Sequence, residues 1–573
     1  MEQPVLILGA GINGAAIARE MLLNGVPVWI VDHADVASGT TAYSSRLIHG
    51  GLRYLEHGEF DLVRESLLER GRLLRLAPQF VQPLRLYIPT ENRVGGFIRS
   101  LLRFCGLSKW IPFRGRSRGE WLVRMGLRLY DTTVRDPRTK NRKVHAVSDA
   151  GDDPEIPHVN GQRYRKLCSY ADAQVRYPER LVMAFLEDAR LLAVENRVEF
   201  RLWNYCRARL NGNSLELIPA CPQQQGLVTA ADARPLAACK LSAVVNATGS
   251  WVDLTLNQLQ MKSRRLIGGT KGSHLVTRHP VVRGLLKGQG IYAEAEDGRP
   301  VFLLPCGDAT LIGTTEIPFE GDPAQVRASE EEIEYLLTAT RRILGDIEIG
   351  REDVEFHYCG VRPLPYVEDG APASTTRRHF IEQHDQASLP FFSVIGGKLT
   401  TCRSLAEEVT AKVLEQLGLE ATKSSAQRVV PGGADYPLDS YALSSRLKQE
   451  AVACDMTREQ LQPVWNLVGS RTQAVLQECM HDESYGSGYI QVATGVLPVP
   501  LVRWFIRHEF VTSLSDLVER RLMLLQESPL TVKCLRELAT LMVAEGVISP
   551  EAVPSEVNSC IQELKRYGKA VRP

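Results

Sequence analysis

The stretch that decides the fold opens the chain, where residues 5–32 read VLILGAGINGAAIAREMLLNGVPVWIVD. Val5–Leu8 and Val28–Val31 are short, continuously apolar runs, which are typical of buried parallel strands. Residues 15–23 between them predict a helix that stops at Asn24-Gly25. A strand, a glycine turn, a helix and a second strand in this order predict a nucleotide-binding unit.

The glycine turn predicts how a dinucleotide would bind. Gly9, Gly11 and Gly14 form the pattern G-x-G-x-x-G, with Asn13 in the same turn. The first glycine makes the tight turn, the second lets the backbone approach a pyrophosphate, and the third lets helix and strand pack closely. Asp32, about 20 residues on, is placed to accept hydrogen bonds from ribose hydroxyls and disfavours a 2′-phosphate.

Two further segments favour FAD over NAD. Residues 38–45, SGTTAYSS, form a small, hydroxyl-rich loop suited to wrapping a long cofactor. Residues 245–251, VNATGSW, are similar to the second nucleotide-contacting turn of flavoproteins with two dinucleotide folds. The cofactor contacts expected in these segments are Thr40, Ser44, Ser45, Ala247, Thr248 and Gly249. An alternative is that these are unrelated polar turns.

Four separate stretches place a basic residue beside glycine or proline: HGGLRY at 49–54, KGSH at 271–274, GVRPL at 360–364 and GGKLTT at 396–401. Glycine lets a backbone pass close to an aromatic ring system, and arginine offers a rigid fork of donors to a phosphate or carboxylate. Each stretch alone is typical of a surface loop with a solvated charge. Together, in a neutral protein, they predict convergence on one anion.

The composition is that of an ordinary globular protein: 573 residues, 44% hydrophobic and 24% charged, with a formal net charge of +1. This length predicts two or more domains, and any charged partner must be met by a local patch. The twelve cysteines are scattered singly without a C-x-x-C pair, so we expect reduced thiols and no metal site. A basic leader and a run of about 18 apolar residues are both missing, which favours a cytoplasmic protein.

The motifs GAGING, SSRLIHGGLRYLE, NATGSW, KGSH, IGTTE, GVRPL and GGKLTT occur in one order along the chain. In these motifs, and over nearly its whole length, the chain resembles the FAD-dependent glycerol-3-phosphate dehydrogenases of the aerobic, membrane-associated type. The resemblance implies oxidation of sn-glycerol 3-phosphate to dihydroxyacetone phosphate by hydride transfer to FAD, with electrons passed to quinone. Departures from that family are Glu316 in place of Asp, Ser250 in place of Pro, and residues 172–180, where any contact is in doubt.

The resemblance also implies roles for individual residues. The substrate phosphate is held by Arg53, Tyr54, Arg362 and Lys398. His49 and His274 are the candidate general bases, because an unperturbed imidazole titrates near neutrality; the alternative for either is a hydrogen bond to the cofactor or the capping of a turn. Arg362 or Lys398 would stabilise an alkoxide. Further expected cofactor contacts are Gly50, Gly397, Lys398, Leu399 and Thr400.

We expect an α/β protein in which a discontinuous, Rossmann-like FAD domain is joined to an antiparallel-sheet substrate domain and a C-terminal α-helical domain. The expected FAD domain comprises residues 1–85, 164–253 and 353–417, and the substrate side residues 86–162 and 254–352. Strands are predicted at 301–304 and 310–313, a linker at 420–437, and helices such as 470–480 and 530–545 within 438–573.

One internal segment breaks the charge balance, since residues 93–128 carry nine Lys or Arg against one acid, interleaved with Phe, Trp and Leu. This pattern is typical of an interfacial amphipathic segment, and it predicts peripheral binding to the inner face of the cell membrane, where quinone dissolves. The alternative is a buried helix with a solvated basic face. Nucleic acid is not an expected partner.

Other functions are kept as alternatives. They are an oxygen-using glycerol-3-phosphate oxidase, an amino-acid oxidase of the same flavin superfamily, and a nucleotide-binding redox sensor without turnover. An amino acid needs one arginine for its carboxylate, whereas the additional basic residues suit a phosphate. A homodimer is an arrangement that the sequence does not decide.

Overall fold

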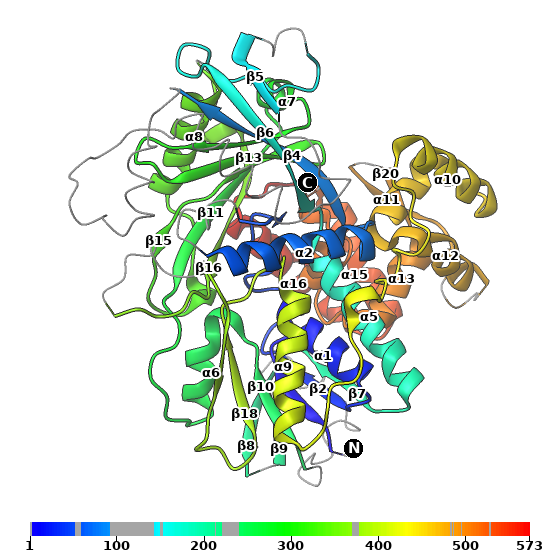
Figure 1. The fold of residues 1–573 in the computed structure, drawn as a ribbon. Helices are drawn as coiled ribbons and strands as arrows, with labels where there is room; N and C mark the ends of the chain where they lie inside the picture. The colour runs from blue at the N-terminus through cyan, green and yellow to red at the C-terminus, as the bar shows by residue number, and fades with distance from the viewer. Residues whose placement is uncertain are drawn as a thin grey trace.

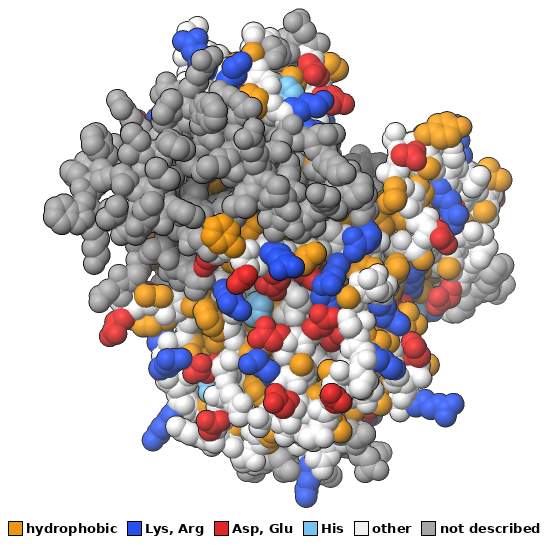
Figure 2. All heavy atoms as spheres, viewed as in Figure 1, with side chains coloured by type: hydrophobic (Ala, Val, Ile, Leu, Met, Phe, Trp, Pro, Cys, Tyr) orange, Lys and Arg blue, Asp and Glu red, His pale blue; other side chains and the backbone are white. Residues whose placement is uncertain are grey.

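The computed structural model describes residues 3–51, 59–91, 143–148, 153–212, 214–220, 240–345, 347–368, 377–481, 484, 486–493, 495–526 and 529–573. Two β-sheets with their helices lie above one another in Figure 1, and a helical C-terminal unit lies against both. On the face shown in Figure 2, basic and acidic side chains of the described residues are interspersed. No described helix is both long and apolar enough to cross a membrane.

The first sheet has six strands in the order β17-β18-β10-β1-β2-β7. Their bounds are β1 Val5–Leu8, β2 Val28–Val31, β7 Phe200–Trp203, β10 Ala243–Asn246, β17 Phe380–Gln383 and β18 Phe391–Ile395. All pairs are parallel except β17 with β18. The two predicted opening strands are confirmed, and the strand order shows how distant segments complete the nucleotide-binding sheet.

Both faces of this sheet are buried, which explains the continuously apolar strands. Val5 and Ile7 pack in one cluster with helices α1 (Ile12–Leu23), α5 (Pro178–Asn196) and α9 (Cys402–Gln416). Leu6 and Leu8 point to the opposite cluster, which includes α6 (Val252–Gln258) and the hairpin β8 (Cys206–Asn211) and β9 (Ser214–Pro219). The predicted first helix is confirmed and begins at Ile12, directly after the second glycine.

The second sheet has ten strands, which are mainly antiparallel; β12 and β4 form a parallel pair. Their bounds are β3 Leu47–Ile48, β4 Val81–Thr90, β5 Lys143–Ala146, β6 Lys166–Val175, β11 Thr270–Thr277, β12 Gly290–Glu294, β13 Pro300–Cys306, β14 Ala309–Gly313, β15 Ile317–Pro318 and β16 Val354–Arg362. Helices α7 (Pro280–Leu286) and α8 (Glu330–Leu344) pack on it, whereas α2 (Phe60–Leu76) lies between the sheets in Figure 1. The strands predicted at 301–304 and 310–313 are confirmed within β13 and β14.

The C-terminal unit is mostly helical, as expected, and the fold class is confirmed. Its elements are α10 Ser440–Ala453, α11 Arg458–Val468, α12 Thr472–His481, β19 Tyr489–Val492, β20 Gly495–Pro498, α13 Val499–His508, α14 Leu514–Asp516, a π-helical turn Leu517–Arg521, β21 Leu530–Thr531, α15 Val532–Ala544, α16 Val553–Arg566 and β22 Val571–Arg572. The predicted linker at 420–437 packs on the protein: Val430 is buried, and a Cβ on Gly432 would lie 2.3 Å from the Val468 carbonyl oxygen.

Four strands of the second sheet fall wholly or partly in ranges that we assigned to the FAD domain. They are β3, β6 and β16, which lie wholly in those ranges, and β4, of which the first half does. An apolar run predicts a strand but carries no information about which sheet the strand joins. The domain boundaries therefore stay predictions.

Candidate active site

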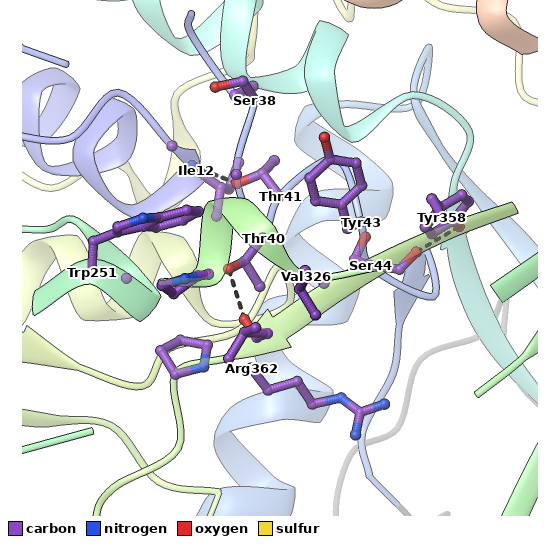
Figure 3. Close-up of a pocket in the computed structure, with 18 of the residues that line it drawn as sticks. Ile12, Ser38, Thr40, Thr41, Tyr43, Ser44, Trp251, Val326, Tyr358 and Arg362 are labelled. Atoms are coloured by element: carbon purple, nitrogen blue, oxygen red, sulfur yellow. Dashed lines mark hydrogen bonds between the residues drawn. The ribbon is translucent and has the colours of Figure 1, made fainter. Parts of the chain in front are cut away.

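A cavity of about 1030 Å³ is lined by both sheets and the C-terminal unit (Figure 3). Seventeen of the residues predicted from the sequence line it: Gly9, Gly11, Asn13, Asp32, Thr40, Ser44, Ser45, His49, Ala247, Thr248, Gly249, His274, Arg362, Gly397, Lys398, Leu399 and Thr400. Gly14 and Gly50 are not among the lining residues. Arg53, Tyr54 and the basic segment 93–128 lie outside the described residues. The assignment of individual roles stays a prediction.

At two positions of the glycine turn, Gly9 and Gly14, a side chain would collide with neighbouring backbone atoms. Gly9 has a φ of +101°, and a Cβ there would lie 2.8 Å from the carbonyl oxygen of Ala247. A Cβ on Gly14 would lie 1.9 Å from the carbonyl oxygen of Gly9. Gly14 thus packs against the backbone of the turn and does not line the cavity, so its role is to let the helix and the turn approach closely.

Asp32 stands at the end of β2 and is fixed by two backbone donors. Its Oδ2 accepts from the Ala10 N–H at 2.6 Å, and its Oδ1 accepts from the Ala34 N–H at 3.0 Å. Burial raises the pKa of Asp32, against the opposing effects of His33 and these hydrogen bonds. The carboxyl group is therefore held at the cavity edge where a dinucleotide's ribose hydroxyls are bound in such folds.

The hydroxyl-rich loop joins the glycine turn to the second sheet (Figure 3). Thr41 Oγ1 accepts from the Ile12 N–H at 3.1 Å, at the start of α1. Thr40 Oγ1 donates to the Val361 carbonyl at 2.9 Å, and the Tyr358 hydroxyl donates to the Ser44 carbonyl at 2.9 Å. Both contacts reach strand β16, so this loop spans from the glycine turn to the second sheet.

Several atoms around the turn fit an extended dinucleotide such as FAD. The buried Asn13 Oδ1 has no hydrogen-bond partner among the described residues. Gly397 has a φ of +92°, and a Cβ there would lie 2.4 Å from Asn13 Nδ2, so the GGKLTT stretch passes directly over the turn. On the other side, Thr248 Oγ1 donates to Asn246 Oδ1 at 2.6 Å and thereby shapes the second turn. A buried acceptor beside glycine backbone is what a cofactor with polar groups can satisfy.

His274 lies on β11 in the wall formed by the second sheet. Its Nε2 lies 2.8 Å from Ser45 Oγ, and its ring stacks on Tyr358 with centroids 4.9 Å apart. Its Nδ1 is buried and has no hydrogen-bond partner among the described residues. Burial, together with the nearby positive charges of Arg362 and Arg46, lowers the pKa of His274 to about 3. The imidazole is therefore neutral at physiological pH.

His49 and Lys398 are two further titratable residues that line the cavity. The pKa of His49 is lowered to about 4, mainly by burial and also by the positive charges of Lys398 and Arg70, against the opposing effect of Asp172. Burial also lowers the pKa of Lys398 to about 7. An anion that entered the cavity would favour the charged form of Lys398 and raise its pKa. The charge of Lys398 would therefore increase when an anionic ligand binds in the cavity.

The prediction that all four basic stretches converge is wrong for Lys271. Its Nζ forms an ion pair with Glu332 at 2.6 Å and does not line the cavity. Successive side chains of a strand point to opposite faces, so Lys271 and His274, three positions apart on β11, face opposite ways. Arg362 and Lys398 do line the cavity.

Sequence reasoning missed a cluster of arginines organised by Glu316. Arg377 Nη2 donates to Glu316 Oε1 at 2.5 Å, and Arg362 Nη1 lies 3.9 Å from the same oxygen. Arg299 Nη1 donates to the Glu316 carbonyl at 3.1 Å, and all four residues line the cavity. They come from separate segments, so no local spacing could have revealed the cluster. Glu316 was noted only as a departure from a family pattern.

Residues 172–180, which depart from the family pattern, form buried ion pairs with other parts of the protein. Asp172 pairs with Arg70 at 2.8 Å, and Glu179 pairs with Arg46 at 3.0 Å. Arg180 Nη2 donates to Glu509 Oε1 at 2.9 Å, which ties α5 to the C-terminal unit. Asp172, Glu179 and Arg180 do not line the cavity.

Comparisons with known proteins agree with this geometry. Residues 4–403 match the profile of the family described as FAD dependent oxidoreductase. The chain is 33% identical to a glycerol-3-phosphate dehydrogenase of Synechocystis sp. over 82% of this chain and 80% of that protein. It is 30% identical both to the aerobic glycerol-3-phosphate dehydrogenase of Escherichia coli and to the D-erythritol 1-phosphate dehydrogenase of Brucella abortus, with 90% of this chain and 93% of each relative covered. The solved structure of glycerol-3-phosphate dehydrogenase from Bacillus halodurans, complexed with FAD, has the same fold, with a TM-score of 0.68, 20% identity, and coverage of 99% of this chain and 95% of that one.

Proposed function

This chain belongs to the family of FAD-dependent oxidoreductases, and from that premise we propose that it oxidises sn-glycerol 3-phosphate to dihydroxyacetone phosphate. FAD, when bound, accepts the hydride that leaves C2 of the substrate. The observation that carries the proposal is that one cavity contains the dinucleotide turn, a neutral buried histidine and a cluster of cations. These are the groups needed to hold a cofactor, accept a proton and bind a phosphate.

We propose that Arg362, Arg377 and Lys398 bind the substrate phosphate. A dianion needs several charge-assisted donors, and guanidinium groups supply them in pairs. Glu316 fixes Arg377 by a direct ion pair and lies near Arg362, so both guanidiniums are oriented before a substrate arrives. Three cations exceed what a single amino-acid carboxylate requires. Arg53 and Tyr54 remain predicted additional ligands.

We propose His274 as the base that takes the substrate's hydroxyl proton, with His49 as the second candidate. The neutral imidazole of His274 lines the cavity, so it can accept a proton from a substrate bound there. Its Nε2 contact with Ser45 orients the ring. Replacement of His274 by Asn should slow flavin reduction much more than the same replacement of His49. The reverse order would assign the role to His49.

The electron acceptor and the cellular location are further proposals. We propose quinone as the acceptor and peripheral attachment to the inner face of the cell membrane, both supported by the composition of residues 93–128. An oxidase that uses oxygen is the alternative. Reduced enzyme mixed with a soluble quinone or with oxygen separates the two: rapid reoxidation by quinone supports the proposal, whereas rapid peroxide formation supports the oxidase.

The substrate is tested by anaerobic addition of candidate compounds to the purified flavoprotein. We expect glycerol 3-phosphate to bleach the visible flavin band, and glycerol and glycine to leave it unchanged. D-Erythritol 1-phosphate is the essential comparison, because a relative that acts on it is as similar as the Escherichia coli enzyme. Faster bleaching by the four-carbon phosphate would replace the proposed substrate, and bleaching by glycine alone would overturn the phosphate assignment.

A further inference from the structure

The C-terminal unit binds the loop that follows β2 through side-chain hydrogen bonds and ion pairs. Asp35, three positions after Asp32, is buried and accepts from Arg521 Nη1 at 2.6 Å and Nη2 at 2.7 Å. Arg520 Nε donates to the same carboxylate at 2.5 Å. Burial alone would raise the pKa of Asp35, but Arg521 and Arg520 lower it to about 2, so the carboxylate is charged. Two arginines thus fix the beginning of the loop.

A second contact fixes the loop near its other end. The Tyr43 and Tyr567 hydroxyls lie 2.9 Å apart, and the Tyr567 hydroxyl donates to Glu519 Oε2 at 3.1 Å. Because the single proton of Tyr567 goes to Glu519, Tyr43 is the donor to Tyr567. The residues that follow Tyr43 are Ser44 and Ser45, and Ser45 contacts His274. The C-terminal unit is therefore connected by hydrogen bonds and two peptide units to the reaction end of the cavity.

The same unit also holds the connection between β7 and β8. The Tyr205 hydroxyl donates to Asp516 Oδ1 at 2.5 Å, and Asn204 Nδ2 donates to the Phe510 carbonyl at 2.9 Å. Directly after Tyr205, residues 206–208 line the cavity. Two separate segments that line the cavity are thus fixed by the segment 510–521.

Side chains of the C-terminal unit also reach the cavity itself. They include Ser513, Ser515, Glu519, Arg520, Glu556 and Tyr567. Buried ion pairs and hydroxyl contacts add little net stability compared with apolar packing, but they fix geometry where each partner must be satisfied. The profile of the FAD-dependent oxidoreductases ends at residue 403, so this unit is an addition to the fold that the profile describes.

We propose that the C-terminal helical unit is part of the cofactor site, and that Tyr567, Arg520 and Arg521 are positioning residues that hold residues 35–45 in the geometry that binds FAD. The unit does more than cover the sheets, because its polar contacts end on the loop that spans the cavity from its nucleotide end to His274. This proposal depends on the FAD cofactor of the family and is independent of the substrate proposed above.

The test is the affinity of the apoprotein for FAD, measured by the change in flavin fluorescence on titration. Tyr567→Phe removes one hydroxyl and keeps the ring, and we expect it to raise the Kd for FAD about tenfold, which corresponds to about 1.4 kcal/mol. The matched control is Tyr436→Phe. The Tyr436 hydroxyl also contacts the C-terminal unit, since it accepts from Trp465 Nε1 at 3.2 Å, but Tyr436 does not line the cavity. The control should keep the wild-type Kd.

A double-mutant cycle separates positioning from a general loss of stability. If the effect passes through the hydroxyl pair, Tyr43→Phe combined with Tyr567→Phe should bind FAD no more weakly than the weaker-binding single variant. The melting temperature of each apoprotein is measured in parallel. Tyr436→Phe and Tyr567→Phe should lower the melting temperature by similar amounts. An unchanged Kd in Tyr567→Phe, or equal losses of affinity in Tyr567→Phe and the control, would overturn the proposal. None of these measurements uses a substrate, so they can fail while the proposed reaction stands.

Discussion

Replacement of Arg362 by Ala is the sharpest test of the phosphate site. The side chain lies at the end of β16, is 28% exposed, and donates to Thr314 Oγ1 at 3.0 Å. A guanidinium that binds a phosphate with two charge-assisted hydrogen bonds contributes about 1.5 to 3 kcal/mol for each bond. Because Arg362 is partly exposed, the lower value applies, and the sum is about 3 kcal/mol. This loss corresponds to a decrease of roughly 100-fold in kcat/KM.

The assay is anaerobic flavin reduction at increasing glycerol 3-phosphate concentration. The phosphate stays bound while hydride leaves C2, so most of the loss should appear in KM, and the flavin should stay bound. Arg362→Lys should recover part of the loss, since it keeps the charge without the fork. Arg264→Ala is the control, because this exposed arginine pairs only with Glu382 among the contacts described for it and does not line the cavity. A change in kcat/KM below threefold, or loss of FAD from Arg362→Ala, would refute the assigned role.

Three further predictions concern the cofactor turn, the interface and pH. Gly14→Ala would place a Cβ 1.9 Å from the Gly9 carbonyl oxygen, so we expect a protein that purifies with little flavin, seen in its ratio of visible to ultraviolet absorbance. Arg180→Ala leaves the carboxylate of Glu509 buried without its bidentate partner, and should lower the free energy of unfolding in urea by about 3 to 5 kcal/mol; a loss below 1 kcal/mol would contradict this. Asp35 has a pKa lowered to about 2 from 3.8, so its stabilising effect is complete above about pH 5 and is lost as the pH falls toward 2; Asp35→Asn should therefore melt at a temperature that varies less over this range.

The sequence alone determined the features that depend on neighbouring residues. The opening strand, turn and helix follow from the apolar run and from Gly9 and Gly14, because the turn's backbone geometry is set within ten positions. The same local reasoning placed Asp32 at the end of the second strand. Most of the predicted cofactor residues, including those of the GGKLTT stretch, line one cavity, since each motif carries its own turn geometry.

Only the tertiary structure decided which distant groups meet. Lys271 faces away from the cavity because the pleat of β11 points it to Glu332, although its stretch resembles the others in composition. Arg299 and Arg377 gather at Glu316, and the C-terminal arginines reach Asp35, through the packing of separate segments. A turn is fixed by backbone torsions of adjacent residues, whereas a buried ion pair depends on how whole sheets and helices pack. Spacing along the chain carries the first kind of information and very little of the second.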